Sequence, residues 1–340
     1  MAKIVTFGEL MIRLQPYNYE RFIQADHLEF SFGGGEANVA VSLANYGENA
    51  VFVTKLPAHA IGQCAVNSLR RYGVDTENIV RGGERVGIYF NEKGASQRPS
   101  VCIYDRAHSA FQESEIGDFD WDSIFEGADW FHFTGITPAL GSNMVEICKM
   151  ACRAAKARNV EISCDLNYRS KLWTREQAHE AMAELCQYVD VCISNEEDAK
   201  DVFGIEATAT DIVAGTLNRE GYMSVAKQLA DQFNFKKVAI TLRESKSAFD
   251  NDWSAMLYDG ENYCFSKVYH LHIVDRIGGG DSFGGGLIHA ILSGKSTQDA
   301  VEFAVAASAL KHSIEGDYNL ATIAEVEKLA GGDGSGRVQR

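Results

Sequence analysis

The chain has 340 residues, of which 46% are hydrophobic, so it can bury one large α/β core or two modest ones. Lys and Arg number 32 against 47 Asp and Glu, a formal net charge of −15. This balance argues against a broad nucleic-acid surface or an anionic-membrane surface, although a few local arginines could still bind an anionic substrate.

The cysteines and the N-terminus indicate the compartment. The eight cysteines are scattered without a C-x-x-C pair, so we interpret them as buried apolar residues. The N-terminal segment is typical of a strand and not of a signal peptide, and no apolar run is long enough to cross a bilayer. We therefore expect a cytoplasmic protein with no membrane partner.

The N-terminal part of the chain alternates between strand and helix patterns. Residues 4–7 predict a buried strand, 36–46 a helix, 50–54 a strand and 61–72 a second helix. Such alternation is typical of a parallel sheet with helical crossovers.

Two segments interrupt this alternation. Residues 10–32 have no helical period, and residues 79–107 contain alternating stretches at 86–91 and 100–104 that predict a β-hairpin. Together these segments, about 10–32 and 79–107, would form a small sheet that acts as a lid over one end of the main domain. Exposed lid strands invite pairing between subunits, so we expect a homo-oligomer, a dimer or higher, through the lid.

The alternation then resumes and continues to the C-terminus. Strands are predicted at 130–133, 161–165, 189–193 and 238–242, helices at 142–158, 175–187, 222–233 and 297–312, and a hairpin around Asp259-Gly260. Thr322 and Glu325 form a capping box that begins a last helix. Residues 1–340 are thus interpreted as a single domain, with a flexible glycine-rich tail at 331–340.

The motif D-R-I-G-G-G-D at residues 275–281 precedes apolar residues at helical spacing. Three successive glycines are unfavourable in regular structure, so we expect Gly278, Gly279 and Gly280 to lead into a helix with bare amides. Bare amides at the positive end of a helix form an anion site. Asp281 beside that site suits a general base that deprotonates an alcohol attacking a phosphoryl group. A plain glycine-rich turn explains this stretch about equally well when it is taken alone.

A second glycine cluster, at residues 33–35, opens the helix of residues 36–46. It is not the dinucleotide fingerprint, because Asn38 stands where a third glycine is needed. A run this tight lets a small ligand approach Gly34 and Gly35, with Asn38 free to bond a hydroxyl. The alternative is a simple helix-entry turn.

Polar residues follow two of the predicted strands. Asn195 to Asp198 come after one strand, and acids at such an end suit a magnesium–water network near phosphates, although they suit a helix N-terminus equally well. Arg169 follows another strand, and with Arg106 it is a candidate to bind a carboxylate through two hydrogen bonds. Tyr89 and Tyr104 lie on the expected lid.

With both glycine clusters in this order, the chain resembles the ribokinase-like (pfkB) carbohydrate kinases. Residues 33–38 are similar to the N-terminal substrate motif of that family, and residues 275–281 to its signature, usually D-T-x-G-A-G-D. The resemblance covers nearly the whole chain. It implies an α/β fold, a three-layer αβα sandwich with a mostly parallel central sheet plus a small β-sheet lid. Within the family the chain is most similar to 2-keto-3-deoxygluconate kinases, through Gly8-Glu9, Tyr89, residues 104–106, residues 165–169 and Gly316-Asp317.

The resemblance implies an activity and a set of site residues. The activity is ATP-dependent phosphorylation of the primary hydroxyl of 2-keto-3-deoxygluconate to the 6-phosphate, with Mg²⁺ bridging the phosphates and activation by K⁺ left open. The residues implied to hold the sugar acid are Gly34, Tyr89, Tyr104, Arg106, Arg169 and Asp317, with Asp275 in the substrate and cation region beside the base Asp281. Those implied along ATP are Asn167 to Arg169, Thr241 onward, and Gly278 to Gly280. We add Asn195 and Arg243 as nucleotide contacts, and Asn195 and Asp198 as contacts to magnesium through water.

Departures from the family pattern leave alternatives open. Arg276 replaces the usual Thr, Gly279 replaces Ala, Asp198 stands where Glu is commoner, and Arg243 where many relatives have Gly. A fructokinase or another family kinase of a neutral sugar is the nearest alternative. A non-catalytic sugar- or nucleotide-binding regulator is disfavoured by Asp281, and an NAD-linked dehydrogenase by the missing fingerprint.

Overall fold

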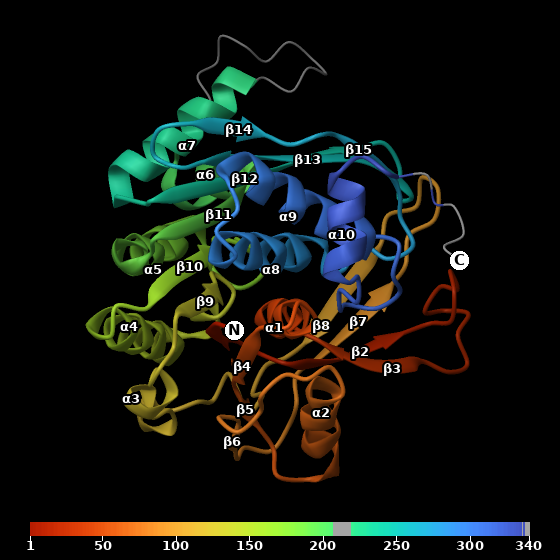
Figure 1. Cartoon of the computed structure of the whole chain (residues 1–340). Coiled ribbons are helices and arrows are strands. Elements are labelled where there is room, and N and C mark those ends of the chain that lie inside the picture. The colour runs from red at the N-terminus through yellow and green to blue at the C-terminus, as the bar shows by residue number, and fades with distance from the viewer. Residues whose placement is uncertain (207–218, 335, 337–340) are drawn as a thin grey trace.

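The computed structural model describes residues 1–206, 219–334 and 336 and is built around a nine-stranded sheet (Figure 1). In spatial order its strands are β14 (Tyr263–Phe265), β13 (Asp250–Tyr258), β12 (Lys237–Ser245), β11 (Val191–Asn195), β10 (Glu161–Asp165), β9 (Trp130–Thr134), β1 (Lys3–Phe7) and β4 (Asn49–Val53), and β15 (Tyr269–His272) also pairs with β13. Strands β4, β1, β9, β10, β11 and β12 are parallel to one another, and β13 pairs antiparallel with β12. The predicted, mostly parallel sheet is confirmed.

Helices cover both faces of this sheet and bury separate apolar cores. One core includes α1 (Gly35–Asn45), α2 (Ala60–Arg70), α8 (Gly279–Leu292), α9 (Thr297–Lys311) and α10 (Ile323–Ala330). The other includes α3 (Trp121–Ile124), α4 (Ser142–Ala157), α5 (Arg175–Leu185), α6 (Glu196–Phe203) and α7 (Arg219–Phe233). Figure 1 shows the sheet between the two groups, which confirms the three-layer sandwich. Within the described ranges, no helix combines the length and apolar character needed to cross a membrane.

A second, four-stranded sheet stands apart from the first. Its order is β3 (Glu29–Gly33), β2 (Met11–Gln15), β7 (Ile88–Glu92) and β8 (Val101–Asp105), and a short pair, β5 (Lys55–Leu56) with β6 (Val80–Arg81), lies elsewhere. Strands β7 and β8 form the predicted antiparallel hairpin, and β2 pairs in parallel with β7. The small sheet therefore takes two strands from each of the two segments that interrupt the alternation, whereas β6 pairs with β5 outside it.

The start of α8 corrects one expectation. Gly278 alone lies outside the helix, with φ +82, while Gly279 and Gly280 form its first turn. Close packing outweighs the low helix propensity of glycine, because this helix also contains three buried glycines that touch its neighbours. A methyl group at Gly285 would lie 2.8 Å from the Cβ of Ser42 on α1. Half of the tail predicted at 331–340, namely residues 335 and 337–340, lies outside the described residues.

Candidate active site

A cavity of about 510 Å³ lies where the parallel strands of the main sheet end, facing the small sheet. Ligands of open α/β sheets bind at this edge, because the loops that follow the strands converge there. All of the predicted site residues line the cavity except Asp275. From the small-sheet side these are Gly34, Gly35, Asn38, Tyr89, Tyr104, Arg106 and Asp317, and from the strand ends and α8 they are Asn167, Arg169, Asn195, Asp198, Thr241, Arg243, Gly278, Gly279, Gly280 and Asp281.

The N-terminus of α8 supplies an anion site. The first-turn N–H groups of a helix have no intrahelical acceptors and carry the positive end of the helix dipole. Gly278 adopts the left-handed conformation, and a methyl group there would lie 2.0 Å from the carbonyl oxygen of Asp317. Gly280 has no atom within 4 Å of the place where a Cβ would stand, so the backbone at this turn is open to a ligand.

Asp281, in the first turn of α8, is held by the start of α1. The Nδ2 of Asn38 donates a hydrogen bond to Oδ2 of Asp281 at 2.7 Å. Burial raises the pKa of Asp281 to about 7, while the Asn38 hydrogen bond and the positive charge of Arg169 oppose that rise. A carboxylate with a pKa near neutral can take a proton from an alcohol at working pH. The sequence led us to expect that Asn38 is free to bond a substrate hydroxyl, but its amide instead donates to Asp281 and positions that carboxylate.

Glu36 is a buried acid that we did not predict from the sequence as a site residue. Its carboxylate accepts hydrogen bonds from the backbone N–H and hydroxyl of Thr134 and from the hydroxyl of Thr137. Burial raises the pKa of Glu36. The contacts fix the beginning of α1, and hence Asn38, to the loop after β9. The sequence feature that could have indicated this role is an acid in the first turn of an otherwise apolar helix.

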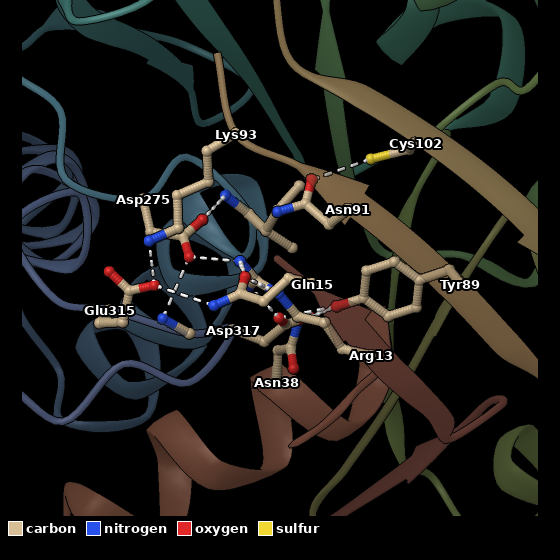
Figure 2. Close-up of polar contacts among 12 residues, drawn as sticks. Arg13, Gln15, Asn38, Tyr89, Asn91, Lys93, Cys102, Asp275, Glu315 and Asp317 are labelled. Atoms are coloured by element: carbon tan, nitrogen blue, oxygen red, sulfur yellow. Dashed lines mark hydrogen bonds and ion pairs between the residues drawn. The ribbon is translucent and has the colours of Figure 1, made fainter. Parts of the chain in front are cut away.

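Arg13, on β2, is a second missed residue and ties the small sheet to the main domain (Figure 2). Its side chain is fully buried, and its Nη2 and Nη1 lie 2.5 Å and 2.6 Å from carboxylate oxygens of Asp275 and Asp317. The Tyr89 hydroxyl donates to Asp317 at 2.6 Å. Asp275 therefore does not contact the cavity, contrary to expectation, because Arg13 and the N–H of Gly316 occupy its carboxylate.

The two arginines predicted to bind a sugar carboxylate differ in their surroundings. Arg106 donates from Nε and Nη2 to one oxygen of Glu9, at 2.8 Å and 2.5 Å, so its charge is already balanced. Arg169 is exposed and donates to the carbonyl of Tyr168, and the described residues place no acid within ion-pair distance of it. Of these two arginines, only Arg169 has no ion-pair partner among the described residues, and its charge acts at longer range on Asp165, Asp198 and Asp281.

The ends of three neighbouring strands form the other wall. Asn195 and Thr241 are paired in register at the ends of β11 and β12. Asn195 caps α6, accepting hydrogen bonds from two backbone N–H groups, and donates to Asp198 at 2.9 Å. Asn167, after β10, has φ +39, a left-handed conformation that asparagine tolerates better than most residues. Burial raises the pKa of Asp198 to about 6.

Two departures from the family pattern meet on this wall. Arg243 and Arg276 both line the cavity beside the N-terminus of α8, and neither has an acidic partner among the described residues. Arg276 donates to the carbonyl of Ala248 at 3.2 Å, and burial together with the charge of Arg243 lowers the pKa of Arg276. Two unpaired guanidinium groups near a helix N-terminus favour a polyanion such as a triphosphate.

The donors at this wall also bear on magnesium. Asp165, Asn195 and Asp198 bring oxygen atoms to the cavity. Across the described residues, no group of three or more His, Cys, Asp or Glu side chains could hold a metal ion unaided. This donor set fits Mg²⁺, which usually keeps water and phosphate ligands and needs only one or two carboxylates from the protein.

The known proteins that this chain is similar to are carbohydrate kinases. The family model for pfkB family carbohydrate kinases matches residues 1–323. The crystal structure of a 2-dehydro-3-deoxygluconokinase from Thermotoga maritima is 51% identical, covers 97% of this chain and 98% of that one, and superposes with a TM-score of 0.93. A 2-dehydro-3-deoxygalactonokinase from Haloferax volcanii is 34% identical over 333 residues, 98% of either chain. A 2-dehydro-3-deoxygluconokinase from Bacillus subtilis is 27% identical over 317 residues, 93% of this chain and 91% of that one.

Proposed function

The chain belongs to the pfkB family of carbohydrate kinases, and from that premise we propose that it transfers the γ-phosphoryl group of ATP to the primary hydroxyl of 2-keto-3-deoxygluconate, giving the 6-phosphate. It is an enzyme, a phosphotransferase with an alcohol as acceptor. The observation that carries the proposal is Asp281, a carboxylate with a pKa of about 7 that lines the cavity at the N-terminus of α8.

In the proposed reaction, Asp281 accepts the hydroxyl proton as the hydroxyl oxygen attacks the γ-phosphorus and ADP leaves. The amides at the start of α8 bind the charge that develops on the transferring group. Gly280 leaves the backbone open to the ligand, while Gly278 and Gly279 have no room for a side chain beside Asp317 and His312. Magnesium, when bound with ATP, neutralises charge on the phosphates.

The remaining nucleotide contacts come from the strand ends. Asn167, Asn195 and Thr241 lie along the bound ATP, with Asn195 and Asp198 reaching its magnesium through water. Arg243 and Arg276 hold its phosphates. Their unpaired charges beside α8 support this assignment.

The sugar acid occupies the side of the cavity under the small sheet. Arg169 binds its carboxylate, supported by the absence of an acidic partner within the described part of the chain. Tyr104, the free face of Arg106 and the backbone at Gly34 contact its hydroxyl groups. Tyr89 and Asp317 line the same wall, held by Arg13. The small sheet acts as a lid that excludes water, which would otherwise hydrolyse ATP.

The outer strand of the small sheet supports an oligomer. Strand β8 is an edge strand, and its Val101, Ile103 and Tyr104 side chains are 39%, 52% and 43% exposed. Apolar edge strands pair readily with another chain. We assign this edge to a contact between two copies, which equilibrium sedimentation of the pure protein would test.

A substrate panel tests the proposed function. ADP release is measured with ATP, Mg²⁺ and 2-keto-3-deoxygluconate, its C4 epimer 2-keto-3-deoxygalactonate, fructose or ribose. The epimer is a second candidate, favoured by the name of the Haloferax volcanii relative. We expect kcat/KM for one of the acids to exceed that for either neutral sugar by about 10–10²-fold, since a bound carboxylate hydrogen-bonded to Arg169 adds about 1.5–3 kcal/mol. Comparable turnover of fructose would identify a neutral-sugar kinase, and no turnover of any sugar would reject the proposal.

A further inference from the structure

Lys311 is a fully buried cation to which the proposed reaction assigns no part. It is the last residue of α9, and its side chain is completely enclosed. Its Nζ donates to the carbonyl oxygens of Asp275 and Ile314, at 3.4 Å and 3.2 Å. Among the described residues no carboxylate lies within ion-pair distance of this Nζ. A buried ammonium with only carbonyl ligands is costly to keep, so its position calls for a function.

The two carbonyls belong to the two loops that shape the anion site. Asp275 begins the turn that ends at Gly278, the N-cap of α8, and Ile314 begins the loop that carries Asp317. The Cε of Lys311 lies 3.3 Å from the place where a Cβ at Gly278 would stand. The ammonium therefore sits directly behind the turn, on the side away from the cavity.

Backbone carbonyl oxygens are also the ligands that bind K⁺ in proteins. The family resemblance places a cation region beside Asp275, so a monovalent metal ion would be sought there. Both sides of Asp275 are already taken by cations of the chain itself, Arg13 at its carboxylate and Lys311 at its carbonyl oxygen. The residues present do not fit an added K⁺.

We propose that Lys311 is a built-in replacement for a monovalent metal ion. Its ammonium joins the two loops, fixes the turn from Asp275 to Gly278, and places a positive charge behind the amides that bind the phosphoryl group. Lys311 is a positioning residue and touches no substrate. Burial lowers the pKa of Lys311, and the charges of Asp275, Asp317 and Asp281 oppose that fall, so the ammonium interacts with the acids of the site. The consequence, which rests on the proposed function, is phosphoryl transfer that needs no K⁺.

The first test uses the wild-type protein in K⁺, Na⁺ or tetramethylammonium chloride at equal ionic strength. We expect kcat/KM for the sugar acid to agree within about twofold across the three salts, since they screen surface charges equally. The thermal midpoint should likewise not depend on which cation is present. Activation by K⁺ of about tenfold or more over tetramethylammonium, or a thermal midpoint raised by K⁺ alone, would overturn the inference.

The second test replaces Lys311 by methionine, which fills most of the space of the side chain and removes its charge, and by alanine, which also vacates that space. We expect both variants to lose about 10²-fold in kcat, as when an anion-hole donor is removed, and only Lys311→Ala to regain activity and thermal stability on addition of K⁺ or NH₄⁺. Lys227→Met, at an exposed lysine of α7, is the matched control and should behave as wild type in every salt. Wild-type activity of Lys311→Met in tetramethylammonium would contradict the inference.

These outcomes separate the inference from the proposed function. No sugar phosphorylation in any salt would reject the kinase assignment, and the thermal midpoints of the wild type would then still decide whether K⁺ has a site. Phosphorylation that requires K⁺ would reject the role of Lys311 alone. If Lys311→Met does not fold, the wild-type salt series decides.

Discussion

On the small-sheet side of the cavity, Arg13 and Arg106 are buried and each is bound to carboxylates. On the side of β12 and α8, Arg243 and Arg276 line the same cavity, and the described residues offer them no acid. A paired arginine is satisfied before any ligand arrives, so it belongs to the framework. An unpaired arginine gains its partner when an anion binds, so it marks where the ligand lies. The chain is acidic as a whole, so two arginines without acidic partners at one wall are a specific indication of an anion-binding site.

Removing a framework arginine should have the largest effect on folding. We expect Arg13→Leu to lower the free energy of unfolding by about 3–5 kcal/mol, because it leaves the buried carboxylates of Asp275 and Asp317 without their partner. Arg243→Leu is the matched control, and an exposed substitution should change stability by no more than about 0.5 kcal/mol. Urea unfolding measures both. Equal losses of unfolding free energy in the two variants would contradict the distinction between structural arginines and ligand-binding arginines.

The next effect separates the two arginines predicted to bind the sugar acid. We expect Arg169→Ala to raise KM for the sugar acid by about 10–100-fold, as for loss of a hydrogen bond to a charged group, with KM for ATP unchanged. Arg106→Ala should act mainly on stability, because it leaves Glu9 buried and unpaired. Steady-state kinetics on both variants test this, and an acid-specific loss in Arg106→Ala alone would assign the carboxylate to Arg106 instead.

A smaller effect is expected for the arginines beside α8. Arg243→Gln and Arg276→Gln should each raise KM for ATP by about tenfold, with KM for the sugar acid unchanged, because each removes one charge-assisted contact to phosphate. Their mutual repulsion means that neither variant should unfold more easily. Unaltered KM for ATP in both variants would remove them from the nucleotide site.

The smallest predicted effect concerns pH. In the proposed reaction Asp281 acts as a base only when it is deprotonated, so kcat/KM should rise with pH and level off above about pH 7. Asn38→Ala removes a hydrogen bond that lowers the pKa of Asp281. The rise of kcat/KM with pH should therefore move to higher pH by about one unit in this variant. The activity that Asn38→Ala loses at neutral pH should return in alkaline buffer. A pH–rate profile that coincides with that of the wild type would show that Asn38 does not hold Asp281.

The two walls also differ in how far the sequence predicts them. The strand order, the glycine clusters and the residues at strand ends depend on local patterns, and all but one of the predicted site residues line the cavity. The pairs that Arg13 makes join residues 262 and 304 positions apart, which no local pattern indicates. Asp275 was misplaced for that reason. The helical start at Gly279 was missed because packing against α1 and α9 overrides the preference of glycine.

The most direct test of the proposed role of Asp281 is the turnover of Asp281→Asn, which keeps the shape of the side chain and removes the base. We predict that kcat falls by about 10²–10⁴-fold, as for loss of a general base, while ATP still binds, measured by calorimetry, with an affinity close to that of the wild type. Turnover near the wild-type rate would contradict it, because the proton of the sugar hydroxyl would then leave by another route.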